Sequence, residues 1–162
     1  MRTVERSRFV RASPEELERW LEPTRIVEAE GSFTARTVED VGGPESVEGA
    51  GESGPVEPVD ESVLEPDDGE ATIVLASGPG LEFPLLFEDR DAAIYYAQAG
   101  DRGPFAHMET WIEHERENEG SRVAVRSTVE LAAPIPFGDR IAAWKRTGEV
   151  ERLLDALEEK FA

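Results

Sequence analysis

The chain of 162 residues carries 36 acidic and 17 basic side chains, which give it a formal net charge of -19 at pH 7. This length predicts one domain with one hydrophobic core. The acidic surface argues against nucleic acids and anionic membranes as partners, because both are bound through clusters of Lys and Arg. The absence of cysteine excludes disulfide bonds, thiolate metal sites and cysteine nucleophiles.

So strong a negative charge predicts a salt-rich environment. In dilute buffer the carboxylates repel one another and destabilise the compact state, whereas at molar salt the Debye length falls to about 3 Å. The first residues lack the apolar core of a signal peptide, and no apolar run approaches the roughly 18 residues of a membrane span. We therefore expect a halophilic, cytoplasmic protein that does not insert into membranes.

The N-terminal part of the chain predicts a strand, one or two short helices and a second strand. Ser13 is a suitable N-cap for the first helix, because Pro14 fits the first helical position and Glu16 can complete a capping box. Pro23 is expected to end that helix. The other expected bounds are 3–12 for the first strand, 24–27 for a brief second helical turn and 32–39 for the second strand.

Residues 42–70 differ abruptly from the rest in composition. They contain six Gly, four Pro and ten acidic residues, with no basic and no aromatic residue. Such a segment buries too little apolar surface to offset the entropy lost on ordering. We expect a single domain over 1–162 that carries a disordered acidic insertion at 42–70.

Five further strands are predicted after this segment, because apolar and β-branched runs alternate there with short turn signals. The runs cover residues 71–77, 81–88, 92–99, 105–116 and 121–131. Short turns join antiparallel neighbours, so the predicted sheet is antiparallel with one apolar face.

Residues 138–162 predict a long amphipathic helix, with Asp139 as a suitable N-cap. Its expected apolar stripe consists of Ile141, Trp144, Gly148, Val150, Leu154, Leu157 and Phe161. The residues expected mostly off this stripe are Arg140, Lys145, Arg146, Arg152, Glu158 and Glu159. The stripe requires a concave apolar surface. We therefore predict an α+β fold in which a curved antiparallel sheet of about seven strands wraps around this helix.

Three segments resemble the SRPBCC superfamily, the START-like helix-grip group. They are FVRASPEEL at 9–17, GSRVAVR at 120–126 and IAAWKRTGEVERLL at 141–154, and the resemblance is closest to haloarchaeal members. It covers nearly the whole chain except 42–70. The superfamily includes polyketide cyclase/dehydrase and lipid-transport proteins. The resemblance implies a helix-grip fold with an apolar cavity between sheet and helix, and it implies neither one activity nor a universal catalytic residue.

The side chains expected to line such a cavity are mostly large and apolar. They are Phe83, Leu85, Phe87, Tyr95, Tyr96, Trp111, Val125 and Trp144. They predict a small apolar or aromatic ligand, with no cofactor and no metal ion.

The turn at 117–120 decides which face of the strand at 105–116 points inward. If Gly120 forms a bulge, the inward residues are His107, Glu109 and Trp111; without the bulge they are Met108, Thr110 and Ile112. An inward Glu109, with His107 beside it, would be a candidate catalytic acid or base. We favour the outward orientation, in which Glu109 is another surface acid.

Other motifs predict no chemistry. The GxGxxG pattern at 49–54 follows no predicted strand, and its neighbouring carboxylates would repel a pyrophosphate. His107 and His114 lie seven residues apart on one strand, which places them on opposite faces and argues against a shared metal ion. The sequence contains no Gly-x-Ser-x-Gly nucleophile elbow.

The leading functional hypothesis is binding or carriage of a small hydrophobic molecule between the sheet and the C-terminal helix. The alternatives are a cyclase- or dehydratase-like enzyme acting in the same cavity, and a protein-interaction module of the co-chaperone type. Apolar lining residues outnumber convergent polar ones, which favours a carrier over an enzyme.

Overall fold

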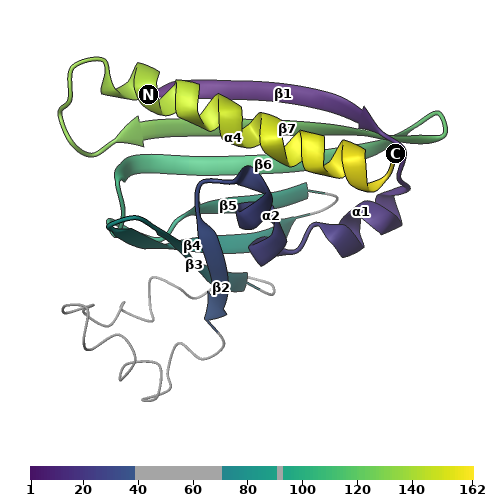
Figure 1. Cartoon of the computed structure of the whole chain (residues 1–162), viewed down its shortest axis with the longest axis horizontal. Coiled ribbons are helices and arrows are strands. Elements are labelled where there is room, and N and C mark those ends of the chain that lie inside the picture. Colours follow the sequence, from purple (N-terminus) through teal and green to yellow (C-terminus); the bar gives the residue numbers. More distant parts are fainter. Residues whose placement is uncertain (39–70, 91–92) are drawn as a thin grey trace.

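The computed structural model describes residues 1–38, 71–90 and 93–162, so the expected insertion at 42–70 lies outside the described residues. Within them, seven antiparallel strands form one curved sheet in the order β1-β7-β6-β5-β4-β3-β2, which confirms the predicted helix-grip architecture (Figure 1). The strands are β1 (Arg2–Val10), β2 (Thr34–Val38), β3 (Ala71–Gly78), β4 (Leu81–Arg90), β5 (Ala93–Gln98), β6 (Phe105–Glu117) and β7 (Gly120–Leu131). The helices are α1 (Pro14–Trp20), α2 (Pro23–Glu30) and α4 (Gly138–Lys160).

The two short helices begin where proline fits a first turn. The hydroxyl of Ser13 accepts a hydrogen bond from the backbone amide of Glu16 at 3.2 Å, as expected for the N-cap of α1. Pro23 starts α2, so the turn expected at 24–27 is a helix of eight residues. Proline is tolerated there because the first amides of a helix have no partner inside it. Gly31 ends α2 in the left-handed region at φ 84.

The β6–β7 turn contains no bulge at Gly120. Glu117 pairs directly with Gly120, and Asn118 adopts a positive φ of 52 in the two-residue turn. Met108 and Ile112 therefore point inward and are buried, while Glu109 points to the other face. This is the second of the two arrangements that the sequence allowed.

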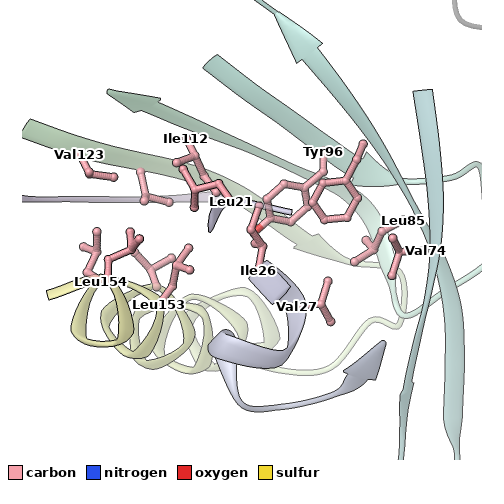
Figure 2. Close-up of a cluster of buried hydrophobic side chains, with 14 of the residues drawn as sticks. Leu21, Ile26, Val27, Val74, Leu85, Tyr96, Ile112, Val123, Leu153 and Leu154 are labelled. Carbon is pink, nitrogen blue, oxygen red and sulfur yellow. The ribbon is translucent and has the colours of Figure 1, made fainter. Parts of the chain in front are cut away.

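The three helices cover the concave face of the sheet. Helix α4 lies along β1 and β7, and α2 lies between α4 and the edge strand β2 with its neighbour β3 (Figure 1). Figure 2 shows Leu153 and Leu154 of α4 facing Ile112 and Val123 of the sheet. Each fully buried leucine stabilises the fold by about 1.5–3 kcal/mol, so this layer is the main apolar contribution of the helix.

The apolar stripe of α4 differs from the predicted one in its first turns. Ile141 and Trp144 are exposed by 58% and 79%, so they do not contribute to the core. The buried stripe instead consists of Arg146, Glu149, Val150, Leu153, Leu154 and Leu157. These residues follow three- and four-residue steps, and Trp144 is rotated about 200° away from Arg146 at roughly 100° per residue. The polar head of Arg146 therefore occupies a position on the buried face.

Asp139 is not the N-cap of α4, as the sequence suggested. The cap is Phe137, with a φ of 60 and no side-chain hydrogen bond, and Asp139 lies in the first turn. Its carboxylate accepts a hydrogen bond from the backbone amide of Leu131 at 3.0 Å. Asp139 therefore ties the start of the helix to the end of β7.

Candidate functional site

A buried polar cluster connects α2, α4 and the sheet. Arg146, which is 4% exposed, donates from Nη1 to Glu30 Oε2 at 2.7 Å, from Nε to Ser127 Oγ at 2.8 Å and from Nη2 to Thr110 Oγ1 at 3.0 Å. The hydroxyl of Tyr96 donates to the carboxylate of Glu30 and accepts from Arg146. The cluster therefore links residues that are far apart in the chain.

The ionisation states in this cluster are set by opposing effects. Burial opposes the charge of Arg146, but the neighbouring carboxylate of Glu30 holds the pKa of the guanidinium well above its usual value. Burial is the main cause that raises the pKa of Tyr96 far above the tyrosine value, so its phenol stays protonated. The charges are paired and the hydroxyls are bonded, so the cluster acts as a structural tie between helices and sheet.

This cluster lies in the region where the sequence predicted an apolar cavity. The expectation that Arg146 lies off the apolar stripe is wrong, because Arg146 is buried on the same face of α4 as Val150. The sequence does contain a signal for the burial of Arg146. This residue lies four positions before Val150, in phase with Leu153 and Leu157.

A second region of the concave face contains a pocket of about 460 Å³, between the sheet and the segment that joins α1 to α2. Its walls come from α1, from the α1–α2 connection and from the adjoining ends of β3, β4, β5 and β6. The lining residues are Glu18, Leu21, Glu22, Pro23, Thr72, Phe87, Glu88, Asp89, Arg90, Ala93, Ile94 and His114. This volume falls within the roughly 300–1,000 Å³ of small-molecule sites.

His114 is the buried polar side chain of the pocket wall. It points inward from β6, in phase with Thr110 and Ile112, and its side chain is 4% exposed. Its Nε2 lies 3.8 Å from Oε1 of Glu18, a carboxylate that is 62% exposed on α1. Its Nδ1 has no hydrogen-bond partner among the described residues. An unpaired buried polar atom costs about 1–3 kcal/mol, so this nitrogen lowers the stability of the folded state.

The rim of the pocket is acidic. Four of its lining side chains are carboxylates, from Glu18, Glu22, Glu88 and Asp89, against the single guanidinium of Arg90. That guanidinium is already paired, because its Nε donates to Glu88 at 2.9 Å. The electrostatic field at the pocket is therefore negative.

Phe87 joins the pocket to the buried cluster. Its ring lines the pocket and stacks on the ring of Tyr96, with 4.4 Å between the ring centroids. Because Tyr96 is fixed by Glu30 and Arg146, this wall of the pocket rests on a rigid support.

The other residues predicted to line a cavity lie outside this pocket. Phe83, Leu85, Tyr96 and Val125 are buried in the core. Trp144 is exposed on α4, away from this pocket. Tyr95 and Trp111 are cross-strand partners on the opposite face of the sheet, with ring centroids 4.7 Å apart.

The two catalytic candidates also belong to that opposite face. Glu109 accepts a hydrogen bond from the hydroxyl of Tyr95 at 3.3 Å, and its Oε1 lies 3.5 Å from Nε2 of His107. Neither residue lines the pocket. The reason is the β6–β7 register, which turns the odd-numbered residues of this part of β6 away from α1 and α4.

Large apolar side chains are exposed around the start of α4. They are Ile135, Phe137, Ile141 and Trp144, with exposures of 54%, 73%, 58% and 79%.

No helix among the described residues is both long and apolar enough to cross a lipid bilayer.

Comparison with solved structures supports the fold assignment. The chain is similar to the protein TTHA0849 from Thermus thermophilus, with a TM-score of 0.65, 20% identity and coverage of 99% of this chain and 97% of the other. It is similar to a START superfamily protein from Mycobacterium smegmatis, with a TM-score of 0.63, 14% identity and coverage of 98% and 96%. A third match is the di-domain ARO/CYC protein BexL, with a TM-score of 0.62, 17% identity and coverage of 98% of this chain and 46% of BexL.

No protein-family model matches the sequence, and no curated protein matches it either. The structural matches establish a START-like fold, and their low identities carry no activity with them.

Proposed function

We propose that the protein binds or carries a small, largely hydrophobic molecule in the pocket below α1. The observation that carries this proposal is the pocket of about 460 Å³, in which Leu21, Phe87 and Ile94 supply apolar walls. The START-like fold, shared with a START superfamily protein and an ARO/CYC protein, supports the same conclusion. The site differs from the one expected from the sequence, because the pocket lies under α1 and its lining contains no residue of α4.

The direct test is to identify what the protein carries and whether this pocket holds it. Protein purified from a lysate of its host is denatured, and released small molecules are identified by mass spectrometry. Thr72→Trp fills the pocket from β3, and Thr3→Trp places the same side chain at an exposed position of β1 as a control. We expect the released molecule to be lost from Thr72→Trp and kept by Thr3→Trp. Equal retention by both variants would contradict the proposal.

A cyclase- or dehydratase-like reaction in the same pocket is the second candidate. It is favoured by the presence of His114 among the lining residues, because histidine is the side chain that most often transfers protons in enzymes. Turnover that disappears in His114→Phe while binding persists would support this candidate. Glu109 and His107 serve as negative controls, because they lie on the other face of the sheet.

A further inference from the structure

We infer that the outer face of α4 is an interaction surface for a second copy of this chain, with the two helices antiparallel about a twofold axis. This inference goes beyond the proposed function and does not depend on it, because no residue of α4 lines the pocket. It rests on two features of the helix: a group of exposed apolar side chains at its start, and a separation of charge along the same face.

The exposed apolar side chains form one group. Ile135 and Phe137 adjoin, because both line one depression at the start of α4. Phe137, Ile141 and Trp144 follow steps of four and three residues, so they lie within about 60° of one another around the helix. An aromatic side chain buries roughly 150–250 Å², and the rings of Phe137 and Trp144 are 73% and 79% exposed. With the two isoleucines the group exposes on the order of 500 Å² per copy, more than half of the roughly 800 Å² that each partner buries in a stable interface.

The charges on this face are separated along the helix. Arg140 lies beside the apolar group, whereas Glu151, Asp155 and Glu158 occupy the second half of α4. At 100° per residue all four lie within about 40° of Trp144. Arg140 and Glu151 are eleven residues apart, or about 16 Å along the axis, so they cannot pair within one copy.

The carboxylates of the acidic half remain accessible to a second partner. Glu151 lies 3.4 Å from Arg6, and Asp155 and Glu158 contact Arg8, both from β1 of the same copy. The three acidic side chains are nevertheless exposed by 50%, 67% and 60%. Each carboxylate has two oxygens and accepts more than one donor.

An antiparallel second copy fits both features. With Arg140 of one copy opposite Glu151 of the other, the twofold axis passes between residues 145 and 146, and this ion pair forms twice. Trp144 then lies opposite Thr147 of the other copy and beside its Gly148, where the missing side chain leaves room for the indole ring. The apolar groups form the centre of the interface and the charges form its rim.

The same charges argue against a lipid bilayer as the occupant. A bilayer laid on this face would dehydrate the three carboxylates of its second half, and anionic lipids would also repel them. A second copy instead places each half of the face against a half of opposite charge.

The first test measures self-association of the full-length chain by sedimentation equilibrium at about 0.15, 0.5 and 2 M KCl. We expect dimers whose dissociation constant falls as salt rises, because two copies of charge -19 repel each other until they are screened. A monomer at all three concentrations would overturn the inference. Binding of that monomer to phosphatidylcholine vesicles, lost in Trp144→Gln, would assign the face to a bilayer instead.

Apolar variants test the centre of the interface. Trp144→Gln and Ile141→Gln should each weaken the dimer by at least about 10-fold, the scale of an interface hot spot. Ile73→Gln makes the same change at a half-exposed position of β3, on the other face of the sheet from the helices, and should leave the dissociation constant unaltered. Circular dichroism checks that each variant is folded. A Trp144→Gln variant that dimerises as tightly as the natural chain would place the interface elsewhere.

Charge reversal tests the antiparallel arrangement, at the lowest of these KCl concentrations at which the natural chain dimerises. Arg140→Glu and Glu151→Arg each bring like charges together at both contacts, so each variant alone should dimerise about 3- to 10-fold more weakly. In an equimolar mixture the heterodimer has opposite charges at both contacts, so the mixture should regain the affinity of the natural chain. A mixture that associates as weakly as the separate variants would overturn the antiparallel arrangement.

Discussion

Replacing Arg146 by methionine should lower the free energy of unfolding by about 3–5 kcal/mol, the usual cost of removing one partner of a buried ion pair. Methionine keeps most of the apolar stem of the arginine but removes the guanidinium. The carboxylate of Glu30, which is 5% exposed, then loses the partner that lies 2.7 Å away. The hydroxyl groups of Thr110 and Ser127 lose a donor as well.

The reciprocal substitution tests whether the pair itself carries this cost. Glu30→Gln removes one negative charge, and Arg146 keeps Glu149 at 3.4 Å as a partial substitute, so its cost should be smaller. In the double variant no unpaired charge remains from this pair. Its loss of stability should therefore be less than the sum of the two single losses, by about 0.5–3 kcal/mol.

The assay is urea denaturation at a fixed KCl concentration, monitored by circular dichroism. The slope of the free energy of unfolding against urea concentration is compared between variants. Arg126→Met is the control, because Arg126 is exposed on β7 and its replacement should change stability by no more than about 0.5 kcal/mol. A cost for Arg146→Met no larger than that of Arg126→Met would refute the assignment of the cluster as a structural tie. Strict additivity in the double variant would refute the direct coupling of Arg146 and Glu30.

Four further outcomes are expected. The midpoint temperature should rise between about 0.1 M and molar KCl, because the net charge of -19 is then screened, and a flat or falling midpoint would remove the halophilic interpretation. Burial raises the pKa of Tyr96, so on raising the pH the unfolded state loses its phenol proton before the folded state does. The free energy of unfolding should therefore be constant with respect to this group below pH about 10 and decline above it, by up to about 1.36 kcal/mol per pH unit. Tyr96→Phe should lessen this slope, as measured by urea denaturation at alkaline pH. Replacing 42–70 by a short Gly/Ser turn should preserve the circular dichroism spectrum, because Val38 already pairs with Ile73 across β2 and β3, and loss of folding would show that the segment packs. Glu109→Gln should change stability by no more than about 0.5 kcal/mol and leave ligand affinity unaltered, and a loss of binding would contradict its place on the outer face.

Local sequence patterns were sufficient to predict the order of the elements. The start of α1 follows from Ser13 and Pro14, because a capping hydroxyl and a proline without an amide proton each satisfy a requirement of the first turn. The antiparallel strands after residue 71 follow from short turns between apolar runs, since such turns join only neighbouring strands. These features depend on interactions within a few residues of the chain.

The site depended on contacts that no local pattern contains. One residue more or less in the β6–β7 turn exchanges the faces of Glu109 and Thr110, so the register had to be seen in the pairing of Glu117 with Gly120. The burial of Arg146 required Glu30, which lies 116 residues away in the chain, to compensate its charge. The pocket likewise forms where Glu18 on α1 meets His114 on β6, two residues brought together only by the packing of helix on sheet. A charged or polar side chain is buried only where surrounding groups offset the cost of removing it from water. Those groups come from distant parts of the chain, and only the tertiary structure brings them together.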